Sequence, residues 1–239
     1  MIIGNGMLAR GFSHYAGSNR HVIFASGVSN SGEQDPAAFA REASLLESVV
    51  RDLPVGATLL YFSTCSLKDP ALSDSLYVRH KAAMEQYISR CVSKFLIVRL
   101  SNIVGQTTNP YLVLPYLHAA VAEGRIFQVW SGAERNLLDL DHARQMIDLL
   151  LQDPAMTNRT VEIASPRYHQ VTEIVSALES HLGVKARFQL VERSSRPDID
   201  LTLSCQLAEI LGLRFEADYL PGLLAKYFPA TDRAQIDRA

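Results

Sequence analysis

Residues 58–66, TLLYFSTCS, decide the fold, because they read as a strand that runs into hydroxyl and thiol side chains. The first six residues are almost continuously apolar, which is typical of a strand buried on both faces of a parallel sheet. A helical pattern follows over residues 76–93, and a second buried strand, FLIVRL, covers residues 95–100. This order predicts a βαβ unit.

The same alternation of strand-length apolar runs and longer helical patterns extends in both directions along the chain. Further strands are expected at residues 1–3, 21–25 and 160–164. Further helices are expected at residues 7–15, 35–53, 115–123, 141–152, 171–182, 203–211 and 221–228. Asp35 before Pro36 suits a helix start, and Gly183 suits a helix stop. We therefore expect an α/β protein with helices on both faces of a parallel sheet, and a frayed polar tail at residues 230–239.

The composition is that of a soluble globular protein, with 239 residues, 48% hydrophobic, 20% charged and a formal net charge of −2. The charge gives no reason to expect a nucleic-acid partner. Cys65, Cys91 and Cys205 fit neither a zinc site nor a disulfide framework, so we expect reduced thiols, no metal and a cytoplasmic location. No apolar run approaches the roughly 20 residues of a membrane span, so no membrane partner is expected.

Residues 4–9, GNGMLA, fit the pattern G-x-G-x-x-G/A between a predicted strand and a predicted helix. Such glycines let the backbone approach a pyrophosphate at the start of the helix. The alternative is a tight turn without a ligand. The acidic residue that usually holds the adenosine ribose is missing from residues 24–26. Arg10 and Arg20 are candidates for a 2′-phosphate, or are simply solvated arginines.

Tyr77 and Lys81 are four residues apart, so a helix places them on one face. An ammonium near a phenol lowers the phenol pKa from about 10 toward the range useful for proton transfer. The alternative is a surface tyrosine that stacks on a lysine stem. Thr64 lies where a parallel strand ends, which is where active sites of such sheets lie. Cys65 is a rival nucleophile, although a small half-buried residue is the favoured interpretation.

In their order and spacing, these motifs resemble the extended short-chain dehydrogenase/reductases, in particular the sugar-nucleotide epimerase/dehydratase group. The resemblance covers nearly the whole length of the chain. It is carried by GNGMLA, FSTCS, YVRHKAAMEQYI, FLIVRLSNIVG, AERNLLDLDHARQMIDLLL, TVEIASPRYHQVTEIVSALESHLG and SSRPDIDLTLSCQLAEILG. It implies a Rossmann-like doubly wound parallel sheet with a small C-terminal substrate lobe. The implied Rossmann-like cofactor-binding domain is residues 1–105 and 137–165, and the lobe is residues 106–136 and 166–239.

The resemblance also implies roles for individual residues. Tyr77 is the implied general acid/base, Lys81 binds the nicotinamide ribose and tunes Tyr77, and Thr64 is the catalytic hydroxyl partner. The implied cofactor-binding residues are Gly4, Gly6, Met7, Leu8, Ala9, Ala25, Ser26, Ser63, Tyr77 and Lys81. The implied substrate-binding residues are Asn102, Arg135 and Arg196, whose guanidinium groups suit a diphosphate. The structural alternative is an ion pair of Arg135 with Asp139 or Asp141, and of Arg196 with Asp198 or Asp200.

Two departures from the family pattern are visible in the sequence. Only about a dozen residues separate the glycine motif from HVIFASG, which resembles the family's fourth strand and not its second. The second and third strands, which form the adenosine pocket, are therefore expected to be missing. The family asparagine that organises the catalytic group is also absent between Asp35 and Pro54.

The implied function is an NAD(P)-dependent epimerase, reductase or dehydratase that acts on a nucleotide-activated sugar, in the assembly of a surface polysaccharide. The alternative is a catalytically silent protein of the same fold that binds nucleotide-sugars or a dinucleotide. The family often dimerises through the tyrosine-bearing helix, and here Ala82, Ala83 and Tyr87 offer a surface for a homodimer.

Overall fold

The computed structural model describes residues 1–229, so the tail predicted at residues 230–239 lies outside the described part of the chain. At its centre is a five-stranded parallel sheet in the order β1-β2-β3-β4-β8. Its strands are β1 (Ile2–Ile3), β2 (His21–Phe24), β3 (Thr58–Thr64), β4 (Phe95–Leu100) and β8 (Arg159–Ile163). The predicted parallel α/β sheet is confirmed.

Strand β1 pairs directly with β2, with Ile2 opposite Ile23 and Ile3 opposite Phe24. Within residues 1–229, no further strand pairs with the other edge of β1. The expected reduction in strand number is therefore confirmed, and the glycine turn lies at the edge of the sheet.

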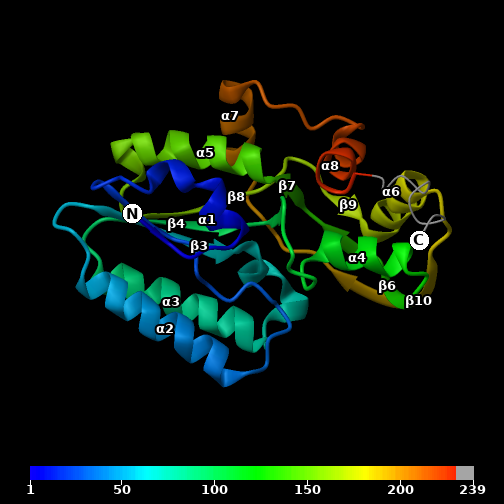
Figure 1. Ribbon diagram of the computed structural model, residues 1–239, viewed down its shortest axis with the longest axis horizontal. Coiled ribbons are helices and arrows are strands. Elements are labelled where there is room, and N and C mark those ends of the chain that lie inside the picture. Colours follow the sequence, from blue (N-terminus) through cyan, green and yellow to red (C-terminus); the bar gives the residue numbers. More distant parts are fainter. Residues whose placement is uncertain (230–239) are drawn as a thin grey trace, which may run out of the picture.

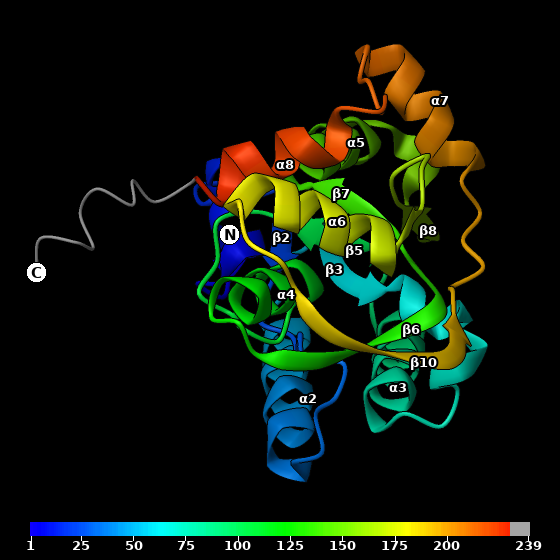
Figure 2. The ribbon, with the colours of Figure 1, turned by 90° about the vertical axis from the view of Figure 1, so that its right-hand side faces the viewer.

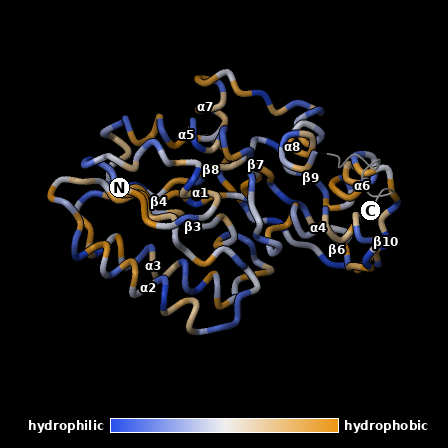
Figure 3. Tube along the Cα trace, in the orientation of Figure 1, coloured by the Kyte–Doolittle hydropathy of each residue, from blue (hydrophilic) through white to orange (hydrophobic). Residues whose placement is uncertain are grey.

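Helices cover both faces of this sheet (Figure 1). On one face, α2 (Pro36–Arg51) and α3 (Leu76–Cys91) pack against β2, β3 and β4. On the other face lie α1 (Met7–Gly11), α5 (Leu140–Gln152) and α7 (Thr202–Leu211). The hydropathy trace shows why both faces are covered, because hydrophobic residues follow one another along the central strands (Figure 3). Short 3-10 helices complete this part: Ser13–Tyr15, Cys65–Lys68, Pro70–Leu72 and Pro154–Met156.

Helix boundaries follow local signals that the sequence carries. The Asp35 carboxylate accepts a hydrogen bond from the Ala37 amide at 2.9 Å, and Pro36 occupies the first turn of α2. Helix α6 (Val171–Leu182) ends at Gly183, which has a φ of 66°. Both predicted boundaries are confirmed. No helix within residues 1–229 combines the length and apolar character needed to cross a membrane.

A smaller lobe contains a three-stranded sheet in the order β10-β6-β9 (Figure 2). Its strands are β6 (Ile126–Arg135), β9 (His169–Gln170) and β10 (Arg187–Ser195), and α4 (Val113–Ala122), α6 and α8 (Tyr219–Tyr227) pack with it around one core. The sequence did not predict β6 or β10, because β10 is exposed along most of its length and carries little apolar pattern. A two-stranded pair, β5 (Asn102–Val104) and β7 (Leu137–Asp139), connects the lobe to the central sheet.

The division into a cofactor-binding domain and a lobe stays a prediction, and the packing of α7 bears on it. Helix α7 lies within residues 166–239, which were assigned to the lobe. However, Leu207 and Ala208 of α7 are buried in the core of the central sheet. The C-terminal segment therefore contributes to both parts of the molecule.

Replacing Leu60 by alanine should destabilise the protein by about 2–5 kcal/mol, because its fully buried side chain lies in the core of the central sheet. The matched control is Val55→Ala, since Val55 is fully exposed and its truncation should cost less than about 0.5 kcal/mol. Urea denaturation measures both values. Equal losses of stability would contradict this account of the core.

Candidate functional site

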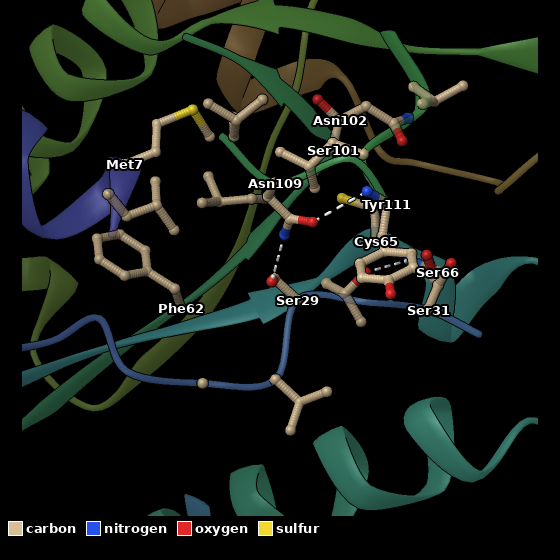
Figure 4. Close-up of a pocket in the computed structure, with 18 of the residues that line it drawn as sticks. Met7, Ser29, Ser31, Phe62, Cys65, Ser66, Ser101, Asn102, Asn109 and Tyr111 are labelled. Atoms are coloured by element: carbon tan, nitrogen blue, oxygen red, sulfur yellow. Dashed lines mark hydrogen bonds between the residues drawn. The ribbon is translucent and has the colours of Figure 1, made fainter. Parts of the chain in front are cut away.

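A cavity of about 660 Å³ lies at the carboxyl ends of the central strands. Its walls come from the glycine turn, the end of β2, the end of β3, helix α3 and the segment that follows β4. Figure 4 shows Met7 on one side of this space and Cys65, Ser66 and Asn102 on the other. Because carboxyl ends of parallel strands are where such folds bind ligands, this cavity is the candidate site.

Most of the residues predicted from the sequence line this cavity. They are Gly6, Met7, Leu8, Ala25, Ser63, Thr64, Tyr77, Lys81, Asn102 and Arg135. Gly4, Ala9, Ser26 and Arg196 are not part of its wall. The structure thus brings the predicted residues into one place, and their roles remain predictions.

The two glycines of the turn are required for different reasons. Gly4 has a φ of +120°, and a Cβ there would lie 2.4 Å from the carbonyl oxygen of Ala25. Gly4 therefore permits the close approach of β1 to the end of β2. A Cβ on Gly6 would meet nothing within 4 Å, so Gly6 leaves space that belongs to the cavity. Ala9 is buried inside α1.

Tyr77 and Thr64 meet in the cavity wall. Tyr77 is only 8% exposed, and burial raises its pKa to about 12, although a hydrogen bond with Thr64 opposes the rise. Glu42 and Cys65 raise the pKa further. The expectation that Lys81 brings this phenol into the neutral range is therefore wrong for this structure.

Lys81 donates its hydrogen bonds away from Tyr77. Its ammonium binds Glu42 Oε1 at 2.9 Å and the Tyr61 hydroxyl at 3.2 Å, and the pair is almost completely buried. Gly27 lies between this pair and the cavity, and a Cβ there would lie 2.5 Å from Lys81 Nζ. The lysine is thus paired with a carboxylate and borders the cavity across a glycine.

Glu42 is a functional candidate that the sequence analysis missed. Besides Lys81, its carboxylate accepts hydrogen bonds from the Tyr61 hydroxyl and the Val28 amide, both at 2.6 Å, and lies 3.0 Å from His80 Nε2. These partners outweigh burial and lower the pKa of Glu42 to about 2. A signal was present in the sequence, because Glu42 occupies a core-facing position of α2.

Ser63 is engaged by a second charged cluster behind the sheet. Its hydroxyl donates to Glu85 at 2.5 Å, and Glu85 also accepts two hydrogen bonds from Arg99. Arg99 and Lys68 both pair with Glu162. The Ser63 hydroxyl is therefore held by the protein, and its contribution to the cavity is mainly its backbone.

The predicted substrate arginines differ in their surroundings. Arg135 donates to backbone and hydroxyl oxygens of Glu134 and Ser195, and it does not form the ion pair with Asp139 or Asp141 that was the alternative interpretation. Burial lowers the pKa of Arg135, and nearby Asp69 opposes this. Arg196 is 59% exposed, pairs with Glu134 and stacks on the Tyr168 ring.

Two loops meet over the cavity. The Asn109 side chain in the loop after β5 donates to the Ser29 hydroxyl at 3.0 Å, as Figure 4 shows. Arg10 on α1 donates to the carbonyl oxygens of Asn5 and Gln106, which ties the same loop to the glycine turn. Of the two arginines considered for a 2′-phosphate, only Arg10 lines the cavity.

Cys65 and a bound metal are not supported as chemical groups of this site. Cys65 donates to the Arg99 carbonyl oxygen, and burial raises the pKa of its thiol. A thiol with a raised pKa is a poor nucleophile. In the described part of the chain, no group of three or more His, Cys, Asp or Glu residues is arranged to hold a metal ion.

By sequence, the chain matches no protein-family model, and a search of curated proteins finds no match for it. By structure, it is similar to the UDP-glucose 4-epimerase of Thermus thermophilus in complex with NAD. That match has a TM-score of 0.66 and 16% identity, and covers 91% of this chain and 79% of that chain.

Two other solved structures show the same likeness. The UDP-glucose-4-epimerase of Stenotrophomonas maltophila, with NAD and formylated UDP-arabinopyranose, gives a TM-score of 0.66 at 18% identity, over 96% of this chain and 81% of that chain. RMD of Pseudomonas aeruginosa, with NADPH, gives a TM-score of 0.65 at 16% identity, over 85% and 78%. The chain has the fold of the nucleotide-sugar epimerases. This confirms the fold that the sequence resemblance implied.

Gly4→Ala and Gly6→Ala should separate the packing role of the turn from its role in the cavity. Gly4→Ala should destabilise the protein measurably, because the new Cβ clashes with Ala25 and the backbone is left-handed. Gly6→Ala should leave thermal stability nearly unchanged, since its Cβ enters open space. Differential scanning fluorimetry compares the two, and an equal or reversed ranking would contradict this interpretation.

Lys81→Met should destabilise the protein by about 3–5 kcal/mol, because it leaves the Glu42 carboxylate buried and unpaired. The double variant Lys81→Met/Glu42→Gln should recover most of that loss. Urea denaturation of the wild type, both single variants and the double variant completes the cycle.

The same pair should control stability in acid. The folded pKa of Glu42, about 2, lies below its ordinary value of 4.5, so its stabilisation is present above pH 4.5 and is lost as the pH falls toward 2. The double variant should lack this part of the acid sensitivity. Identical acid profiles for the wild type and the double variant would contradict the assignment.

Proposed function

We propose that the chain is an NAD(P)-dependent enzyme that acts on a nucleotide-activated sugar. The single observation that carries the proposal is the convergence of Thr64, Tyr77, Lys81 and Arg135 on one cavity beside the glycine turn. The solved epimerases of the same fold, which were crystallised with NAD and UDP-linked sugars, support it. Surface polysaccharide assembly is the proposed setting, by resemblance.

The residues present fit the nicotinamide and diphosphate part of a dinucleotide. Gly6 leaves open space where a side chain would fill the cavity, and Gly27 leaves the cavity in contact with Lys81. In contrast, β1 is the last strand of the sheet on the side where an adenosine pocket would be expected. We therefore propose that binding depends mainly on the diphosphate and the nicotinamide ribose, with little recognition of adenosine.

In this proposal each residue has a defined task. A bound nicotinamide would supply or accept hydride. Tyr77 would hold or release the proton of the substrate oxygen, and Thr64 would orient that oxygen by hydrogen bonding. Arg135 would bind the substrate diphosphate, since its present partners are backbone and hydroxyl oxygens and none is a carboxylate.

A second candidate function is a catalytically silent protein that binds nucleotide-sugars. Two observations favour it: the central sheet ends at β1, and Glu42 occupies the Lys81 ammonium. Binding of a nucleoside diphosphate without any binding of NAD(H) or NADP(H) would select this alternative.

Thermal-shift measurements that cross NAD(H) and NADP(H) with UDP, GDP, CDP and dTDP test the proposed ligands. A ligand at about 100 times its Kd stabilises a protein by about 2.7 kcal/mol, which raises the melting temperature detectably. We expect a dinucleotide and one nucleoside diphosphate to raise it together more than either does alone. The absence of any shift with dinucleotides would contradict the proposed enzyme.

Once a substrate is found, Tyr77→Phe should lower kcat by about 10²–10⁴-fold and leave ligand binding intact, because only the proton-transfer group is lost. Tyr87→Phe on the same helix is the control, since Tyr87 lies outside the cavity wall. Full turnover by Tyr77→Phe would contradict the assignment of Tyr77.

A further inference from the structure

A buried ion pair lies directly behind the candidate proton-transfer tyrosine. Glu42 is 1% exposed and Lys81 is 3% exposed, and their charged atoms are 2.9 Å apart. The Glu42 carboxylate is also held by the Tyr61 hydroxyl and the Val28 amide. Such a network fixes the carboxylate in one position, so it neutralises Lys81 permanently and not in passing.

The other groups around this pair do not restore a positive charge. From β3 it is faced by the neutral Tyr61 hydroxyl, and from its own helix α3 by His80 and Glu85. The second carboxylate, Glu85, contributes negative potential at Lys81. His80 Nε2 lies against Glu42 and not against Tyr77. Tyr77 itself faces Thr64, Cys65 and Glu42.

We propose that Glu42 is a positioning residue that keeps Tyr77 a protonated phenol, which makes this site a carbonyl reductase of keto sugars rather than an alcohol oxidase. The inference rests on the proposed function, because it names the direction in which that site works. It assigns to Glu42, on a different helix, control over the proton on Tyr77. A lone Lys81 cation would favour the phenolate, whereas the neutral pair does not.

The proposed step balances in atoms and electrons. The carbonyl carbon of the keto sugar accepts a hydride from a reduced nicotinamide cofactor, and the π electrons of the C=O bond move to oxygen. That oxygen takes the proton of the Tyr77 hydroxyl, and the resulting phenolate recovers a proton from water. The sugar is reduced to an alcohol, and the cofactor is oxidised by one hydride.

The acidity of Tyr77 agrees with this direction. Burial and the nearby Glu42 raise the pKa of Tyr77 to about 12, so only about one phenol in 10⁵ is ionised at pH 7. A phenol in this state is ready to donate a proton. A base that removes a proton from an alcohol would have to be the rare phenolate.

The test is a pH titration of the unliganded protein that carries ¹³C at the tyrosine ring carbon bearing oxygen. Tyr77→Phe assigns the Tyr77 resonance by its disappearance. In the wild type, this resonance should stay at its phenol position from about pH 6 to about pH 10. Glu42→Gln should move its midpoint down by about one to three pH units, since Lys81 then faces Tyr77 unbalanced. Glu47→Gln is the matched control, because Glu47 is exposed on the same helix, and it should change nothing.

Ionisation of Tyr77 below about pH 9 in the wild type would overturn the proposal, and this result needs no variant. An unmoved Tyr77 midpoint in a folded Glu42→Gln protein would overturn it too. If Glu42→Gln does not fold, Glu42→Asp replaces it, because it withdraws the carboxylate from Lys81 by one methylene and should lower the midpoint by a smaller amount. Since no ligand is used, failure of the proposed function would appear separately, as absent dinucleotide binding.

Discussion

The direct pairing of β1 with β2 is the constraint on which the rest of the molecule depends. It places the glycine turn next to the ends of β2 and β3, so that Gly6, Ala25 and Thr64 line one cavity. The pairing is possible because Gly4 lacks a side chain, since any Cβ would clash with Ala25. Without that approach, the turn and the catalytic strand would not face a common space.

The same constraint divides the ligand site into a retained half and a missing half. The side toward α3 keeps Thr64, Tyr77 and Lys81, and the lobe contributes Arg135. The side beyond β1 has no strand within residues 1–229. A sheet shortened in this way keeps the machinery for hydroxyl and carbonyl chemistry, and gives up the surface on which an adenosine would rest.

Charge around the tyrosine is where this chain differs most in chemical terms from a simple tyrosine–lysine pair. A lone lysine would stabilise the phenolate, but Glu42 lies 2.9 Å from its ammonium. Buried ion pairs contribute little net stability, and some are kept because they specify one arrangement of the structure. In our account, the specified property is the proton on Tyr77.

The sequence was sufficient for features that depend on local signals. The start of α2 at Asp35 and the end of α6 at Gly183 were predicted because capping acts within a few residues. The buried strands β3 and β4 were predicted because each is apolar on both faces. The missing strands were predicted because the chain between residues 9 and 21 is too short to contain them.

The remaining features depend on contacts between distant residues. Strand β10 pairs with β6, about 60 residues earlier, and its exposed residues give little apolar pattern. Glu42 and Lys81 are 39 residues apart in sequence, so neither residue type nor spacing predicted their contact or the raised pKa of Tyr77. Arg196 was placed correctly in its loop, but its pairing with Glu134 could not be deduced from nearby acidic residues.

The central claim is that the shortened sheet binds a dinucleotide through its nicotinamide half. Its most direct test compares the Kd of NADH with that of reduced nicotinamide mononucleotide, which lacks the adenosine half, by nicotinamide fluorescence. The account predicts that the two values agree within about tenfold, or about 1.4 kcal/mol. Binding of NADH that is about a thousandfold tighter would contradict it, because that difference requires a pocket for the adenosine half.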